Sequence, residues 1–251
     1  MINNDIKSIK EFTNKIHGWL TDREGEFLYK IAKKCSGQGV IVEIGSWKGK
    51  STIWLGKGSI AGNNVKVYAI DPHTGSSEHK KSGKGVWTFE KFKENIKDAG
   101  VNDVIISIVE TSEKAVKEWN IPVEFIFIDG AHEIEFVEKD FLLWFPHIID
   151  GGIIAIHDTT SCFRYLLPGW PGPKKVAERF IFKSRNFKDV GLIDTITYGT
   201  KCKENSLKDK IKIKCVRFKK YVPDFIHLLL RNESKIPRPI KSIGKVLLKL
   251  I

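Results

Sequence analysis

Short apolar runs and amphipathic segments alternate along the first part of the chain. Each run is five or six residues long, which is too short for a typical helix and suits a strand buried on both faces. The runs occupy residues 40–44, 65–70, 104–109, 123–128 and 151–156. Between them, apolar side chains recur every three or four positions, the spacing of one helix face. The alternation predicts an α/β fold, with a parallel sheet covered by helices on both faces.

The later segments complete this predicted sheet. Residues 190–198 and 211–218 alternate between apolar and polar side chains, which predicts two more strands in an antiparallel pair. We therefore expect a Rossmann-like, doubly wound, mostly parallel sheet of seven strands with an antiparallel last strand. Residues 1–36 are expected to form an N-terminal helical cover. The sheet domain would occupy residues 37–219, and residues 220–251 would form a basic C-terminal helical tail.

The C-terminal region differs from the rest of the chain in charge. Residues 201–251 hold 15 Lys and Arg against 4 Asp and Glu, whereas residues 1–200 hold 27 against 26. Aliphatic residues recur at helical spacing beside lysines within residues 240–250, which predicts a basic amphipathic helix. Such a helix suits an anionic membrane surface. Docking on its own domain, or on a second copy in a homo-oligomer, explains the same pattern. A nucleic-acid partner is not expected, because the tail resembles no base-reading module.

The overall composition is that of a globular protein. The chain has 251 residues, of which 41% are hydrophobic and 29% charged. No apolar run approaches the length of a membrane span. The first fifteen residues are polar and charged, unlike a signal peptide. We therefore expect a cytoplasmic protein, peripheral at the membrane if the tail binds lipid.

The first strand ends in a glycine turn that carries candidate chemistry. Residues 40–52 read Val-Ile-Val-Glu-Ile-Gly-Ser-Trp-Lys-Gly-Lys-Ser-Thr, which places Glu43, Gly45, Ser46 and Gly49 around the turn. The phosphate loop of a nucleotidase needs four residues between its glycines, and this turn has three. A dinucleotide fingerprint fails because bulky residues stand where glycines are required. An ordinary strand, turn and helix also fits, so the rest of the chain must decide.

Asp71 follows the second strand directly, about twenty residues beyond Gly49. In nucleotide-binding α/β folds an acid at this place accepts hydrogen bonds from the ribose hydroxyls of the ligand. A carboxylate can accept from both hydroxyls of a diol at once. The other interpretation is an aspartate that only starts a turn.

Four further polar side chains follow two strands that should be neighbours. Asp129 and His132 come after the fourth strand, and His157 and Asp158 come after the fifth. Carboxylates gathered at one edge repel each other unless a cation or protons offset their charge. Oxygen-rich groups suit Mg²⁺ or another divalent cation. Alternatively, Asp129 contacts only a cofactor and Asp158 caps a turn.

Three segments together resemble a known family. "IVEIGSWKGKST", "FIDGAH" and "GGIIAIHDTT", in this order and spacing, are similar to the S-adenosylmethionine (SAM) dependent O-methyltransferases. The group includes the macrocin-type sugar O-methyltransferases, the cephalosporin-hydroxylase-like proteins and the catechol O-methyltransferases. The resemblance covers roughly residues 20–200 and implies a class I methyltransferase fold.

The resemblance also implies site roles. The cofactor would contact the first turn, the ribose-binding acid, the loop that approaches the adenine, and the tip of the fourth strand. The corresponding residues are Glu43, Gly45, Ser46, Gly49, Asp71, Thr111, Ser112 and Asp129. Thr111 and Ser112 also fit a helix cap.

For catalysis, the resemblance implies that His132 is the general base and that Asp129, His157 and Asp158 hold a divalent metal such as Mg²⁺. The sequence departs from the family at His157, where the sugar enzymes place an acid.

The function implied is methyl transfer from SAM to a hydroxyl of a sugar or another small polar metabolite, for example on a lipid-linked glycan. Residues 73–87 and 161–173 would contact the acceptor, the latter with Phe163, Tyr165 and Trp170. Two alternatives stay open. One is a phosphate-loop nucleotidase. The other is a non-catalytic SAM-fold binding module that docks through its basic tail.

Overall fold

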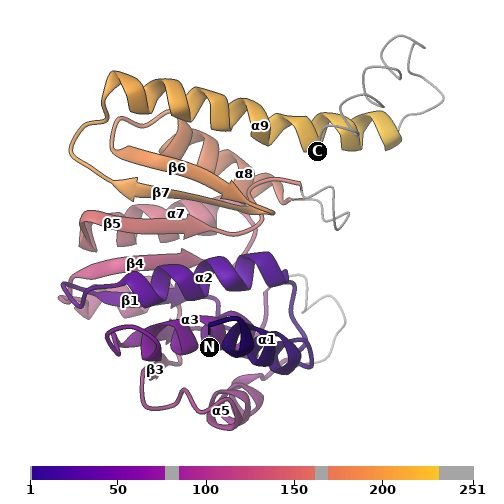
Figure 1. The fold of residues 1–251 in the computed structure, drawn as a ribbon, viewed down its shortest axis with the longest axis vertical. Coiled ribbons are helices and arrows are strands. Elements are labelled where there is room, and N and C mark those ends of the chain that lie inside the picture. Colours follow the sequence, from indigo (N-terminus) through magenta and orange to yellow (C-terminus); the bar gives the residue numbers. More distant parts are fainter. Residues whose placement is uncertain (1, 77–84, 162–168, 232–251) are drawn as a thin grey trace.

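The computed structural model describes residues 2–76, 85–161 and 169–231, and it is built on a sheet of seven strands (Figure 1). The strand order is β3-β2-β1-β4-β5-β7-β6. The strands are β1 (Val40–Ile44), β2 (Val67–Ile70), β3 (Ile105–Ile108), β4 (Val123–Ile128), β5 (Ile148–Ile156), β6 (Phe187–Ile193) and β7 (Ile196–Lys201). Strands β1 to β5 are parallel, and β7 runs antiparallel to both β5 and β6. The predicted mostly parallel sheet is confirmed.

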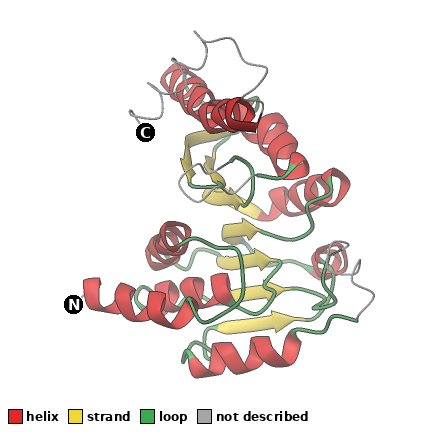
Figure 2. Cartoon of the chain, turned by 90° about the vertical axis from the view of Figure 1, so that its right-hand side faces the viewer, coloured by secondary structure: helices red, strands yellow, loops and turns green. Residues whose placement is uncertain are grey.

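Helices cover both faces of this sheet (Figure 2). The longer ones are α1 (Ile2–Thr13), α2 (Asp22–Lys34), α3 (Lys50–Ile60), α5 (Phe89–Asp98), α7 (Ile134–Trp144) and α9 (Leu207–Arg231). The shorter ones are α6 (Ser112–Ala115), η1 (Val116–Glu118), η2 (Phe145–His147), α8 (Pro171–Val176) and the π-helix η4 (Ala177–Phe182). One core includes Leu28, Trp54 and Phe92 of α2, α3 and α5. The other includes Phe141 of α7 and Ile213 of α9.

Helix α2 packs tightly against α3. It begins with a capping box, in which Thr21 accepts from the backbone of Glu24 and the Glu24 side chain accepts from the backbone of Thr21. A Cβ atom on Gly25 would lie 2.3 Å from the Trp54 ring, so only glycine permits this approach. The first turn of α2 is thereby held beside the sheet.

The two last strands differ from the prediction. Residues 190–198 are not one strand, because Asp194 and Thr195 form the tight turn between β6 and β7, with Asp194 at φ +47°. Residues 211–218 are helical and belong to α9. The apparent alternation arose because Ile213 faces the core while Ile211 and Phe218 are exposed on the helix. When a helix has apolar residues on two opposite faces, its sequence can show the two-residue alternation that is typical of a strand.

Helix α9 continues through residue 220, where the sequence predicted the start of a separate tail. The predicted amphipathic helix within 240–250, and the predicted acceptor contacts Phe163 and Tyr165, lie outside the described residues. Among the helices that the structure describes, none is long and apolar enough to span a bilayer.

Candidate active site

The strand register brings the predicted site residues to one edge. Ile44 at the end of β1 is level with Ile70 of β2 and Ile128 of β4, and Ile128 is level with Ile156 of β5. The next residue on each strand is therefore at the same carboxyl edge of the sheet. These residues are Gly45, Asp71, Asp129 and His157. Strands β2 and β3 lie on one side of β1, and β4 and β5 lie on the other, so the strand order reverses between β1 and β4. Open α/β sheets bind ligands at this point of reversal.

A cavity of about 520 Å³ opens at this edge. Its wall includes the predicted residues Gly45, Ser46, Asp71, Asp129, His132, His157 and Asp158. It also includes Trp19 from the segment between α1 and α2, Trp47 and Lys50 beside the glycine turn, and Trp170 before α8. The N-terminal cover thus contributes part of the cavity wall.

The glycine turn after β1 depends on Gly45. Its φ is +87°, and an added Cβ would lie 2.1 Å from the backbone oxygen of Asp129. A side chain here would be strained and would collide with the next strand tip. Trp47 follows with φ +47°, and its backbone N–H donates to Asp71 Oδ2 at 2.7 Å. The turn is therefore tied to the tip of β2.

Asp71 is positioned by a second backbone contact. The N–H of His73 donates to Asp71 Oδ1 at 2.6 Å, so each carboxylate oxygen accepts one backbone bond. The ring of His73 is buried, with Nδ1 2.9 Å from the hydroxyl of Thr88. Asp71 thus presents a fixed carboxylate to the cavity, as a ribose-binding acid would require.

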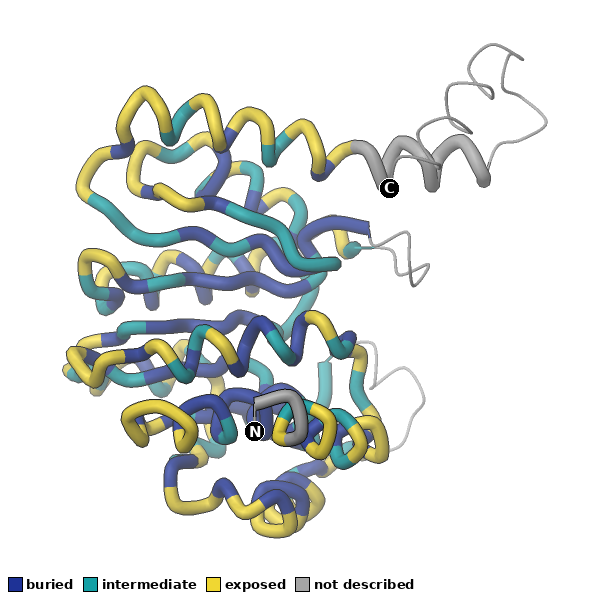
Figure 3. Tube along the Cα trace, viewed as in Figure 1, coloured by how far each residue is buried: buried dark blue, intermediate teal, exposed yellow. Residues whose placement is uncertain are grey.

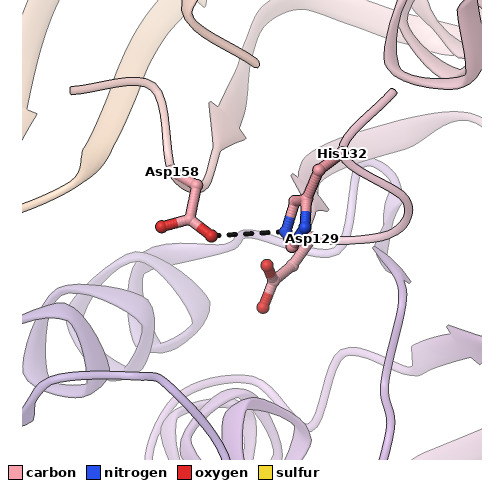
Figure 4. Close-up of side chains that lie close together, drawn as sticks. All are labelled: Asp129, His132 and Asp158. Atoms are coloured by element: carbon pink, nitrogen blue, oxygen red, sulfur yellow. Dashed lines mark ion pairs between the residues drawn. The ribbon is translucent and has the colours of Figure 1, made fainter. Parts of the chain in front are cut away.

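Asp129, His132 and Asp158 form the site's cluster of metal-type donors (Figure 4). One ligand atom from each lies within 4.8 Å of the others. His132 Nε2 is 3.3 Å from Asp158 Oδ2, and the ring of Trp170 stacks on the His132 ring at 4.8 Å and 5°. Asp158 has φ +57°, and its backbone oxygen accepts from Trp170 N–H at 2.8 Å. Two carboxylates and an imidazole at this spacing fit a divalent cation.

His157 lies behind this cluster and is buried. Its Nδ1 is 2.9 Å from Asp129 Oδ1 and 3.4 Å from Asp158 Oδ2, while its Nε2 is 3.4 Å from Glu24. Burial alone would lower the pKa of His157, but Asp129, Asp158 and Glu24 raise it well above the usual value. The imidazolium therefore supplies positive charge among three carboxylates. The sequence predicted His157 as a metal ligand, whereas both of its nitrogens here face carboxylates.

The same charges act on the aspartates. Burial would raise the pKa of Asp158, but His157 and His132 hold it below the usual range. For Asp129, burial outweighs the attraction of His157, and its pKa is raised.

Glu24 is a site residue that the sequence did not reveal. Its fully buried carboxylate accepts from the N–H and hydroxyl of Thr195, at 2.8 and 2.7 Å, and from Thr21 N–H at 2.8 Å. Burial would raise its pKa, but His157 and these hydrogen bonds hold it below the usual value. A capping box explains Glu24 locally, so no sequence signal points to the contact with His157.

Four predicted cofactor residues are not among the described residues that line the cavity. Glu43 is buried, accepts from the Thr52 hydroxyl at 2.5 Å, and has a pKa that burial raises to about 8. Gly49, at φ +86°, caps α3 and lies against Phe92. Thr111 caps α6, and the Ser112 hydroxyl donates to Asp140. The structure gives each of these residues a structural contact within the fold.

Comparison with known proteins agrees with this architecture. Residues 42–159 match a family model described as a methyltransferase domain. The O-methyltransferase NovP superposes with a TM-score of 0.61 at 15% identity, covering 74% of this chain and 83% of NovP.

Two further solved structures are similar. The O-methyltransferase TomG from Streptomyces achromogenes, in complex with SAM, gives a TM-score of 0.54 at 15% identity, covering 79% of this chain and 89% of TomG. An O-methyltransferase from Bacillus cereus, in complex with SAH, gives a TM-score of 0.51 at 18% identity. The match covers 79% of this chain and 91% of the Bacillus protein. The chain therefore has a Rossmann-like methyltransferase fold, matches the methyltransferase-domain model over residues 42–159, and is similar in structure to O-methyltransferases.

Proposed function

We propose that this chain is a SAM-dependent O-methyltransferase that methylates a hydroxyl of a sugar or another small polar metabolite. The proposal rests on the arrangement of residues around one cavity. A glycine turn and a fixed acid, Gly45 and Asp71, face it from one side, and Asp129, His132 and Asp158 face it from the other. A cofactor pocket and a set of acid–base groups thus share one space.

The first side supports cofactor binding. The absence of a side chain at Gly45 lets the turn lie against the backbone of Asp129, and both residues line the cavity. Asp71 would accept hydrogen bonds from the ribose hydroxyls with the lone pairs that its two backbone donors leave. SAM supplies the methyl group as part of a sulfonium ion, which the carboxylates of this cavity would attract.

The second side supports deprotonation of the acceptor. His132 would accept the hydroxyl proton, and Asp158 Oδ2, 3.3 Å from His132 Nε2, would orient the ring and stabilise the imidazolium that results. Trp170 would hold the ring in place by stacking on it. Positioning of the oxygen against the methyl carbon would contribute most of the rate.

A divalent cation fits the same donors. Asp129 and Asp158 would hold it, with His132 beside the ion as the base. When bound, such an ion lowers the pKa of a coordinated hydroxyl. The buried His157 cation would offset part of the negative charge of Asp129 and Asp158.

The acceptor class rests on the family resemblance, and Trp19, Trp47 and Trp170 on the wall suit a sugar or another ring. The nucleotidase alternative is not favoured, because the N–H of Trp47 in the turn donates to Asp71 and a phosphate would meet carboxylates. The non-catalytic alternative has no supporting observation at this cavity. Cytoplasmic location stays a prediction, as does membrane contact through residues 220–251.

The experiment is a transfer assay with methyl-labelled SAM, a panel of sugars and small hydroxyl metabolites, and added Mg²⁺ or EDTA. Label in an O-methylated product supports the proposal, and loss of transfer in EDTA supports the metal. SAM binding without transfer to any acceptor favours the non-catalytic module, and ATP hydrolysis without SAM binding favours the nucleotidase.

A further inference from the structure

Helix α9 carries an apolar stripe that faces solvent. Leu207, Ile211 and Phe218 are 75%, 57% and 73% exposed. Spacings of four and seven residues place these side chains on one face of the helix. Figure 3 shows exposed positions recurring along this helix on its outer side. Large exposed apolar groups in a row mark an interaction surface more often than single ones do.

The stripe is opposite the face that packs on the protein. Ile213 is buried in the core beneath α9, and the Lys220 Nζ donates to the backbone oxygen of Lys174. At 3.6 residues per turn, these positions point away from Leu207, Ile211 and Phe218. The core therefore does not need the outer stripe, and its apolar character has no structural role in the described chain.

Basic side chains border the stripe. Lys208, Lys212, Lys214 and Lys219 are exposed on the same outer half of α9. Between residues 207 and 221 there are six Lys and one Arg against a single Asp. Arg217 instead pairs with Glu178 beside the packed face. An apolar centre with a lysine border is thus exposed over nearly four helical turns.

We propose that the outer face of α9 docks on an anionic lipid membrane surface, with the helix lying parallel to it. Leu207, Ile211 and Phe218 would enter the boundary between headgroups and acyl chains, and the bordering lysines would reach the lipid phosphates. Long lysine side chains can bury their stems while the ammonium groups stay in the headgroup layer. The surface lies on described residues, so it does not depend on the predicted helix within 240–250. It is also independent of the proposed methyl transfer.

The charge pattern argues against two other occupants. In a two-fold dimer the same patch meets itself, which would place the lysine borders of two α9 helices against each other. A nucleic acid would gain from the lysines but would leave the apolar centre without a matching surface. An anionic bilayer matches both the charge and the apolar centre.

The test is flotation of the full chain with vesicles of phosphatidylcholine alone or with phosphatidylserine, at low and high salt. The stripe variant is Ile211→Gln with Phe218→Gln. The matched control is Phe136→Gln with Leu142→Gln on α7, whose side chains are 54% and 51% exposed. We expect binding to anionic vesicles only, weaker at high salt, and at least about tenfold weaker in the stripe variant than in the control. Residues 232–251 are present in every variant, so the difference belongs to α9.

A second readout uses Cys215, an exposed free cysteine between Ile211 and Phe218 along the helix. Anionic vesicles should slow its alkylation, as followed by peptide mass spectrometry, while Cys202 serves as the internal reference. Equal vesicle binding by stripe and control variants would overturn the proposal. So would a stripe variant that changes only from dimer to monomer, because that result assigns the face to a second copy. Circular dichroism confirms that both variants are folded.

Discussion

His157 Nε2 lies 3.4 Å from the carboxylate of Glu24, across 133 positions of sequence. The contact joins the first turn of α2 to the tip of β5, directly behind the cluster of Asp129, His132 and Asp158. A helix that would otherwise serve as a cover therefore takes part in the electrostatics of the site. Both groups are buried, so neither charge is screened by water.

Glu24→Gln should destabilise the protein by roughly 3 kcal/mol, because it leaves the buried His157 cation with less negative charge nearby. The amide oxygen can still accept from Thr195, but the amide NH2 replaces the oxygen that accepts from Thr21 N–H, so the loss includes that capping bond as well as the charge. Urea unfolding at neutral pH measures the change. Glu26→Gln on the same helix is the control, since its partly exposed pairs with Lys10 and Lys30 should contribute less than about 1 kcal/mol. Equal losses in the two variants would contradict the prediction.

Stability should also depend on pH through His157. Its pKa is raised in the folded state, so its contribution is complete below the unfolded pKa of about 6.5 and is lost as pH rises through the folded value. Between those values the folded chain binds more protons than the unfolded chain, and the free energy of unfolding must fall as pH increases. His157→Asn should lack this component. Urea unfolding from about pH 6 to about pH 9 tests this, with His17→Asn as an exposed control. A pH slope that is the same in both variants would refute it.

Asp158→Asn should weaken divalent metal binding at least about tenfold, since the cluster loses a charged ligand. Asparagine tolerates the positive φ at this position, so the backbone should be retained. Titration with Mn²⁺, followed by electron paramagnetic resonance, gives the affinity directly. Glu113→Gln, which removes an exposed carboxylate paired with Lys139, should leave Mn²⁺ binding unchanged. If both variants bind Mn²⁺ as tightly as the wild type does, the metal site must lie elsewhere.

Trp170→Ala should reduce turnover roughly tenfold while SAM affinity stays within about twofold, because the stack on His132 positions a base and not the cofactor. Transfer kinetics and SAM calorimetry on the same preparations separate these effects. The control is Phe136→Ala, which removes an exposed aromatic ring of α7 that is not among the described cavity-lining residues and should leave both quantities unchanged. A large loss of SAM affinity in Trp170→Ala would show instead that this residue holds the cofactor.

The edge of the sheet was predictable because each apolar run ends directly before a glycine or a polar residue. Ile44, Ile70, Ile128 and Ile156 close four runs, and parallel strands align such ends. Trp47 lies within the predicted turn and Lys50 directly follows it, so their approach to the cavity follows from adjacency.

Other features depend on tertiary contacts that local patterns do not encode. Glu24 contacts His157 because helix α2 packs closely on α3, where Gly25 lies against Trp54. Residues 211–218 of α9 were predicted as a strand because apolar residues lie on two opposite faces of the helix, and Ile211 and Ile213 look like alternation along the chain. Thr111 and Ser112 fitted two interpretations. In the structure Thr111 caps α6, whereas the Ser112 hydroxyl donates to Asp140 of α7.

Calorimetry with SAM on the wild-type chain and on Asp71→Ala tests the cofactor site most directly. A carboxylate that accepts from ribose hydroxyls contributes about 1.5–3 kcal/mol, so Asp71→Ala should bind SAM at least roughly tenfold more weakly. Asp103→Ala, an exposed aspartate in the loop before β3, should bind as the wild type does. Unchanged SAM affinity in Asp71→Ala would contradict the assignment of this cavity to the cofactor.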